Sequence, residues 1–76
     1  MPTSVHHPRY LALRAELMTL RKKSGLSQIQ LAQALGVGQS YVSKVERGEM
    51  YVDLLLFVDW CRACGTAPEH VVTKLS

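Results

Sequence analysis

The sequence predicts an all-α protein, a compact bundle of five helices formed by one domain. Apolar residues recur at steps of three and four, as on one face of a helix, and do not alternate as they do in strands. Glycines that can end a helix divide the chain at Gly25, Gly36, Gly48 and Gly65. With 47% apolar residues among 76, the chain can bury one core but is too short for two domains.

These breaks divide the chain into a tail and five expected helices. Residues 1–8 are expected to form a flexible N-terminal tail and residues 9–76 the folded domain, although Pro8 is acceptable in a first helical turn. The helices are expected to run up to Gly25, from Ser27 to Gly36, over residues 39–47, from Asp53 to Cys64, and over residues 69–75. Ser27 and Asp53 are good N-caps, and Gln30 completes a capping box with Ser27.

Residues 27–48 carry the most informative pattern. Two short helical segments are separated by a tight Gly-Val-Gly turn, and the second segment carries small polar, amide and cationic side chains. This build is typical of a helix-turn-helix, in which one helix supports a second in the major groove of DNA. Residues 1–47 also hold seven Lys or Arg against two acids, whereas residues 48–76 hold two against four. A basic front half suits a surface that faces phosphates, although ordinary solvated charge explains so modest a total equally well.

Short motifs continue this pattern in order along the chain. They are Leu26-Ser27-Gln28, Leu31-Ala32, Leu35-Gly36-Val37 and Glu46-Arg47-Gly48, followed by Leu54, Phe57, Cys61, Gly65 and Pro68. With this order and spacing, residues 10–72 resemble the helix-turn-helix family of phage repressors and Cro proteins, the XRE family. The resemblance implies five helices, of which the second and third contact DNA. It also implies a buried ion pair between Arg21 and Glu46, and the alternative is two exposed charges that contribute almost nothing to stability.

Base reading is expected from the start of the third helix. Gln39 carries an amide that can pair bidentately with adenine, and Ser40 beside it can donate or accept a hydrogen bond. Lys44, one turn further on, can reach either guanine acceptors or a phosphate. The matching positions of the resembled family contact base edges. The alternative for Gln39 is a solvated surface amide.

Phosphate contacts are expected from hydroxyl, amide and cationic side chains near the helix ends. The candidates are Ser27, Gln28, Tyr41, Ser43 and Arg47. Two of them keep an alternative: the ring of Tyr41 can pack over the turn, and Arg47 can simply flank Glu46. Glu49 departs from the family, which commonly has basic or polar residues after the glycine at this point. Since a carboxylate repels phosphate, this loop is not expected to make close contacts with the DNA backbone.

The region from residue 54 to 75 holds more apolar residues than one helical stripe can bury. A core stripe is expected at Leu54, Phe57, Val58, Cys61 and Cys64. The apolar residues beyond it are Leu55, Leu56, Trp60, Val71, Val72 and Leu75. Because exposed apolar patches mark interfaces, a two-fold homodimer is expected, with reading helices about 34 Å apart on an inverted-repeat operator. The alternative is that the N-terminal tail covers Leu55 and Trp60.

Catalysis, metal binding and membrane insertion find no support in the sequence. Cys61 and Cys64 match C-x-x-C, but at a helix C-terminus, where a thiolate is disfavoured. A zinc site needs two more ligands, and only His70 offers itself. The longest apolar run, residues 54–58, is too short to span a bilayer, and no signal peptide precedes it. We therefore expect a cytoplasmic, non-enzymatic protein with reduced thiols and without metal or cofactor.

The function predicted from these features is sequence-specific binding of double-stranded DNA by a transcriptional regulator. The simplest form is a bacterial or phage repressor that binds an inverted repeat as a homodimer. One alternative is an antitoxin-type DNA-binding protein whose apolar surface also covers a toxin partner. Another is a helix-turn-helix that serves only as a protein-interaction module, although such a module need not keep Gln28, Gln39 and Lys44.

Overall fold

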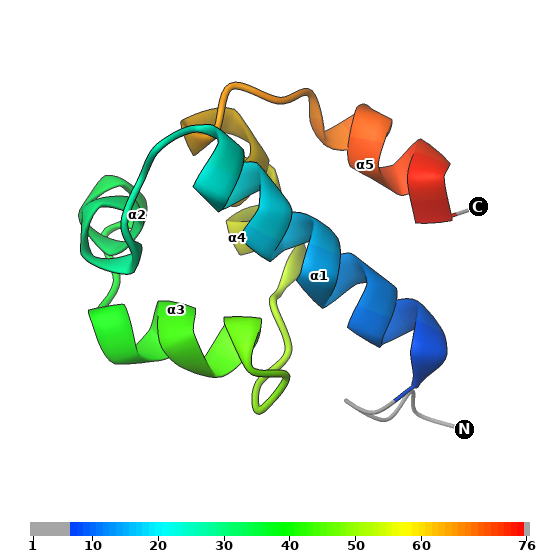
Figure 1. The fold of residues 1–76 in the computed structure, drawn as a ribbon, viewed down its shortest axis with the longest axis horizontal. Helices are drawn as coiled ribbons and strands as arrows, with labels where there is room; N and C mark the ends of the chain where they lie inside the picture. Colours follow the sequence, from blue (N-terminus) through cyan, green and yellow to red (C-terminus); the bar gives the residue numbers. More distant parts are fainter. Residues whose placement is uncertain (1–6, 76) are drawn as a thin grey trace.

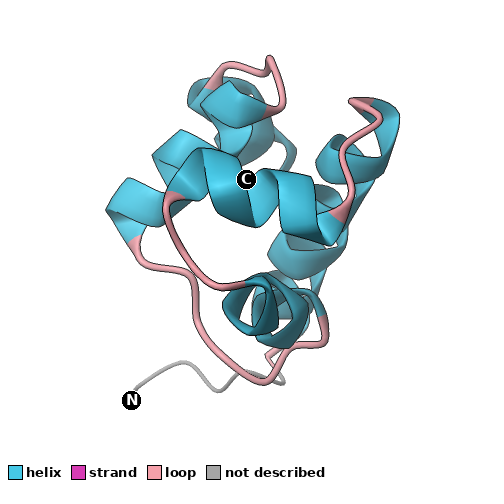
Figure 2. Cartoon of the chain, turned by 90° about the vertical axis from the view of Figure 1, so that its left-hand side faces the viewer, coloured by secondary structure: helices cyan, strands magenta, loops and turns pink. Residues whose placement is uncertain are grey.

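The computed structural model describes residues 7–75, and every regular element within that range is a helix (Figures 1 and 2). The helices are α1 (Pro8–Lys23), α2 (Gln28–Leu35), α3 (Gln39–Glu46), α4 (Leu54–Ala63) and α5 (Pro68–Leu75). The predicted all-α fold with five helices is therefore confirmed. Among residues 7–75, no helix combines the length and hydrophobicity needed to cross a bilayer.

The starts of α2 and α4 follow the predicted capping chemistry. The Ser27 hydroxyl accepts from the Gln30 amide at 3.0 Å, and the Gln30 side chain accepts from the Ser27 backbone N–H at 2.9 Å. Asp53 caps α4 by accepting from the Leu56 N–H at 2.8 Å. Helix α1 begins at Pro8 with His7 as its N-cap, so the helix starts inside the range predicted as tail. The remainder of that predicted tail, residues 1–6, lies outside the described residues.

Helix α1 runs through the middle of the molecule (Figure 1). Helices α2 and α3 lie at one end of it, and α5 lies on the side of α1 opposite to α3. Helix α1 contacts α3, α4 and α5, while α2 contacts α3 and α4. The core that these contacts enclose includes Leu17, Leu31, Val42, Val45 and Trp60, all fully buried. This packing holds α3 at the edge of the bundle with its outer face free of other helices (Figure 1).

The buried face of α4 differs from the predicted one. Leu56, Phe57, Trp60 and Cys61 face the core, whereas Leu54, predicted as core, is 74% exposed. Since residues 54–58 are all apolar, periodicity alone does not choose between faces. Trp60 has the largest apolar surface and an N–H that needs an acceptor, and its Nε1 donates to a backbone carbonyl of α1 at 3.1 Å. Burying this ring turns α4 so that Leu54 points outward.

Half of the residues predicted for the dimer surface, two on α4 and one on α5, are instead buried in the core. Leu56, Trp60 and Val71 were expected at an interface, but each is buried within a single chain and cannot contact a partner. They are buried because so small a domain needs its large apolar side chains to close one core. The expectation that these three residues are surplus apolar residues outside the core is therefore wrong. Leu55 and Val72 remain exposed, at 77% and 51%, and Leu75 is partly exposed.

Candidate nucleic-acid interface

Helix α3 presents a polar outer face because its apolar residues fall on the opposite side. Val42 and Val45 are fully buried against the core, and their spacing fixes the rotation of the helix about its axis. Gln39, Ser40 and Lys44 are consequently exposed, as predicted for side chains that reach a ligand. The turn before α3 depends on Gly36, which ends α2 in the left-handed region with φ of +71°.

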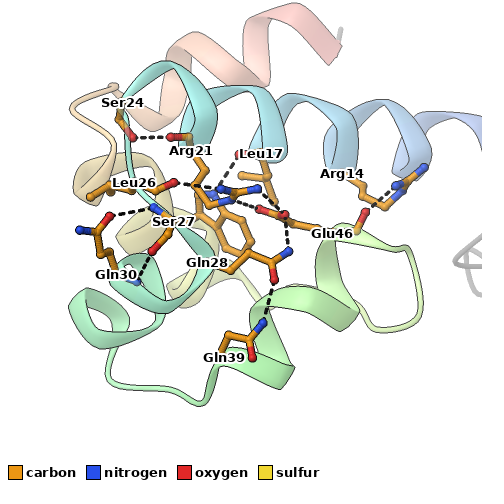
Figure 3. Close-up of polar contacts among 11 residues, drawn as sticks. Arg14, Leu17, Arg21, Ser24, Leu26, Ser27, Gln28, Gln30, Gln39 and Glu46 are labelled. Atoms are coloured by element: carbon orange, nitrogen blue, oxygen red, sulfur yellow. Dashed lines mark hydrogen bonds and ion pairs between the residues drawn. The ribbon is translucent and has the colours of Figure 1, made fainter.

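A buried ion pair joins the end of α1 to the end of α3, as the family resemblance implies. Arg21 Nε lies 2.6 Å from Glu46 Oε2, and Arg21 Nη2 donates to Glu46 Oε1 at 3.0 Å (Figure 3). The side chains of Arg21 and Glu46 are only 11% and 3% exposed. The remaining amine of Arg21, Nη1, donates to the Leu26 carbonyl at 2.9 Å, so the guanidinium also holds the loop before α2. The alternative of two exposed charges is thus ruled out by the geometry.

Two glutamines extend this pair to the surface. Gln28 Nε2 donates to Glu46 Oε1 at 2.9 Å, and Gln39 Nε2 donates to Gln28 Oε1 at 2.9 Å (Figure 3). A carboxylate only accepts, so the amide of Gln28 must turn its NH₂ group inward and its oxygen toward Gln39. The oxygen of Gln28 in turn fixes which end of the Gln39 amide faces it. Charge at Glu46 therefore sets the orientation of an exposed amide two side chains away.

The orientation of Gln39 leaves a defined hydrogen-bonding edge. One N–H of its Nε2 is used by Gln28, which leaves the second N–H and the whole carbonyl oxygen available. Adenine presents one acceptor, N7, and one donor, N6, in the major groove. The free edge of Gln39 has the complementary donor and acceptor.

The residues expected to contact phosphates have different hydrogen-bond partners in the structure. Ser27 lies in the capping box, where its hydroxyl oxygen is engaged but its hydrogen is not fixed by that bond. Tyr41 donates its hydroxyl to the Tyr51 carbonyl at 3.4 Å, so this hydroxyl is directed at the loop that follows α3. Ser43 accepts from Arg47 Nη1 at 2.6 Å. The structure therefore does not bring all five predicted phosphate ligands into one cluster.

Arg47 pairs with Glu49 and not with the neighbour that was expected. Its Nε and Nη2 donate to the two carboxylate oxygens of Glu49 at 2.6 and 3.3 Å. The expected neighbour, Glu46, is instead paired with Arg21. Both members of the Arg47–Glu49 pair are more than half exposed. The hydrogen bond from Arg47 is the main reason that the pKa of Glu49 lies below its usual value.

Two residues of α1, Arg14 and Tyr10, hold α3 and the loop after it, and neither role was predicted from the sequence. Arg14 donates through Nη1 to the Glu46 carbonyl, one of the acceptors that the end of α3 leaves open. Its position seven residues before Arg21 places both cations on one face of α1, which is a signal that the sequence contained. Tyr10 donates its hydroxyl to the Met50 carbonyl at 2.7 Å and accepts from the Val52 N–H at 3.1 Å. It thereby holds the loop that follows α3.

The cysteines have the surroundings of core residues. Cys61 is fully buried, and burial raises the pKa of its thiol to about 11. Burial likewise raises the pKa of Cys64. Neither forms a disulfide, and no group of three potential metal ligands is present among residues 7–75. A thiol with a raised pKa is a poor nucleophile at neutral pH, and this favours a structural role for both.

The fold and this surface define a helix-turn-helix protein, and comparisons with known proteins identify its family. Residues 17–71 match the sequence profile of the family described as Helix-turn-helix. The XRE-family like protein from Pseudomonas syringae pv. tomato str. DC3000 is 43% identical over 88% of this chain and 82% of its own, with a TM-score of 0.83. No curated protein sequence matches significantly. The chain belongs to the helix-turn-helix family and is of the XRE type.

Two further solved structures have names that state their roles. The clp gene regulator ClgR from Corynebacterium glutamicum is 33% identical, over 84% of this chain and 82% of its own, with a TM-score of 0.76. The restriction-modification controller protein C.AhdI from Aeromonas hydrophila is 34% identical, over 80% of this chain and 92% of its own, with a TM-score of 0.74. Both share the helical fold over most of their length.

Proposed function

We propose that this chain is a DNA-binding transcriptional regulator that reads base edges with Gln39, Ser40 and Lys44. The observation that carries the proposal is the hydrogen-bonded series from Glu46 through Gln28 to Gln39. It orients an exposed amide whose free edge complements adenine in the major groove. Kinship with regulators such as ClgR and C.AhdI supports the same assignment. Lys44, one turn after Ser40 on α3, is exposed and serves either a guanine or a phosphate.

We assign phosphate contacts to the N-terminal end of α2 and to Ser43 of α3. The Nε2 group of Gln28 has a second N–H beyond the one given to Glu46, and Ser27 and Ser43 carry hydroxyls. Such contacts set the register of the protein on the duplex but carry no sequence information. Tyr41 is the weakest of the predicted contacts, since its hydroxyl is directed at the following loop.

The experiment for this proposal is selection of binding sites from random duplex DNA, followed by titration of Gln39→Ala on the selected site. A bidentate amide–adenine pair contributes about 1–3 kcal/mol of discrimination, so the variant should lose about five- to 150-fold preference for adenine at one position. Gln33→Ala, which removes an exposed glutamine of α2 that is not part of the series from Glu46 to Gln39, is the matched control. Failure of wild-type protein to enrich any sequence at low salt would refute the function.

A two-fold homodimer is the proposed assembly, and its proposed surface is narrower than predicted. Leu54 and Leu55 at the start of α4 and Val72 and Leu75 on α5 are exposed or partly exposed apolar residues. A shallow apolar groove of about 240 Å³ lies between the two helices and is lined in part by Leu54, Val72 and Leu75. An operator with inverted repeats follows from this symmetry. Repression by occlusion of a promoter is the simplest mode of regulation that we propose for such a protein.

Sedimentation equilibrium tests the assembly. Wild-type protein should be dimeric and Leu55→Glu monomeric with an unchanged helical spectrum, because a charge in an apolar interface is desolvated without a partner. Ala12→Glu on the exposed side of α1 adds the same charge elsewhere and should leave the dimer intact. A monomeric wild-type protein would exclude the homodimer and favour the alternative in which this surface covers a different protein, as in an antitoxin.

A further inference from the structure

The loop after α3 places the carboxylate of Glu49 against Arg47, the cation at the end of this helix. Arg47 is the C-cap of α3, and Gly48 follows in the left-handed region with φ of +77°. This reversal is held by backbone hydrogen bonds, in which the Gly48 N–H donates to the Val45 carbonyl at 3.0 Å and the Glu49 N–H donates to the Lys44 carbonyl at 2.8 Å. The backbone of Glu49 is therefore fixed, and its side chain returns toward Arg47.

The guanidinium of Arg47 has an acceptor from its own chain at each nitrogen. Nε and Nη2 face the two oxygens of Glu49, and Nη1 donates to Ser43 Oγ at 2.6 Å. Guanidinium binds a phosphate through the same planar fork that it uses here for a carboxylate. A DNA phosphate would have to displace Glu49 from this fork. The displaced carboxylate would then remain two residues away and repel the phosphate.

The positions of Gln39, Ser43 and Arg47 place this competition beside the base-reading edge. These residues follow at intervals of four and therefore lie on one face of α3. Lys44 is near enough to Glu49 for its positive charge to help lower the pKa of that carboxyl, after the larger effects of the Arg47 contact. One carboxylate thus offsets cationic charge on the surface that is proposed to approach DNA.

We propose that Glu49 is an affinity-limiting residue, which holds Arg47 away from phosphates and so lowers the binding of every duplex regardless of sequence. This inference rests on the proposed DNA-binding function. Its consequence is that Arg47 contributes little to DNA binding in the native protein, although it is a cation at the end of the reading helix. A larger share of binding energy then depends on contacts made by Gln39 and its neighbours.

A double-mutant cycle measured by fluorescence anisotropy tests the inference. Wild type, Glu49→Gln, Arg47→Gln and the double variant are titrated with a selected duplex and an unrelated duplex between 50 and 200 mM salt. Glu49→Gln should tighten binding about three- to tenfold for both duplexes. The log–log salt slope should steepen by about 0.9, because one more phosphate is neutralised. Arg47→Gln should change little alone, and in its background Glu49→Gln should gain less than about twofold.

A charge-matched control separates this contact from general repulsion. Glu69→Gln removes one negative charge from α5, which lies across the molecule from α3, and should leave affinity and salt slope unchanged (Figure 1). An equal gain from Glu49→Gln in both Arg47 backgrounds, or no gain at all, would overturn the inference while the DNA-binding function stood. Absence of duplex binding by every variant, wild type included, would overturn both.

Discussion

Arg21→Met should destabilise the protein strongly, because it leaves the Glu46 carboxylate buried without its cation. Glu46 is 2% exposed and accepts two hydrogen bonds from Arg21 and one from Gln28. Methionine preserves most of the side-chain volume but removes both charged bonds, along with the bond to the Leu26 carbonyl. After the substitution, one amide hydrogen bond remains to stabilise the buried charge.

The size of the expected loss in unfolding free energy follows from the burial of the Arg21–Glu46 pair. Breaking a buried ion pair by removing one partner costs about 3–5 kcal/mol, whereas an exposed pair contributes less than about 1 kcal/mol. Because Arg21 keeps 11% exposure, the lower end, about 3 kcal/mol, is expected. A domain of this length has a free energy of unfolding of about 4–11 kcal/mol, so the loss is a large part of the total.

Urea denaturation followed by circular dichroism measures this loss. Replacing both members, Arg21→Met with Glu46→Met, should recover at least about 1 kcal/mol relative to Arg21→Met, because no stranded charge remains. Lys74→Met breaks the more exposed pair with Glu16 and should cost less than about 1 kcal/mol. A loss from Arg21→Met no greater than that from Lys74→Met would refute the reasoning from burial.

Two further predictions concern a turn and a thiol. Gly48→Ala should destabilise more than Gly36→Ala in thermal unfolding: both positions have positive φ, which costs about 1–2 kcal/mol, but only at Gly48 would a Cβ lie 3.1 Å from Arg14. Equal losses would show that the contact with Arg14 is unimportant. Because burial raises the pKa of Cys61 from 9.0 to about 11, stability should hold below about pH 9 and fall by up to about 2–3 kcal/mol toward pH 11. Cys61→Ala should reduce this fall but not abolish it, because burial also raises the pKa of Cys64. An identical pH profile for wild type and Cys61→Ala would contradict the prediction.

Local interactions made much of the fold predictable from the sequence. The capping box of Ser27 and Gln30 and the cap at Asp53 depend on residues three apart, so neighbours in the chain decide them. The exposed face of α3 was also predictable, because only Val42 and Val45 of that helix are aliphatic and their spacing selects one side. The pair of Arg21 with Glu46 came from the family resemblance and is present in the structure.

Choices between chemically similar residues required the tertiary structure. In the apolar run at the start of α4 every rotation buries leucine, and the face is selected by the place that α1 offers to Trp60. For this reason the prediction from the sequence wrongly placed Leu54 in the core and Leu56 at the surface. Likewise, the sequence has two acids near Arg47, and it does not show which of them pairs with this residue. The packing of α3 against α1 buries Glu46 beside Arg21, so that Arg47 pairs with Glu49.

The amino-acid order alone thus determined five helices, the caps at Ser27 and Asp53 and the polar character of α3, since these depend on groups within about one helical turn of each other. The folded arrangement decided which way the Gln39 amide faces and which carboxylate Arg47 meets. Both depend on side chains brought together from separate helices or by the turn after α3, and no local spacing encodes those distances.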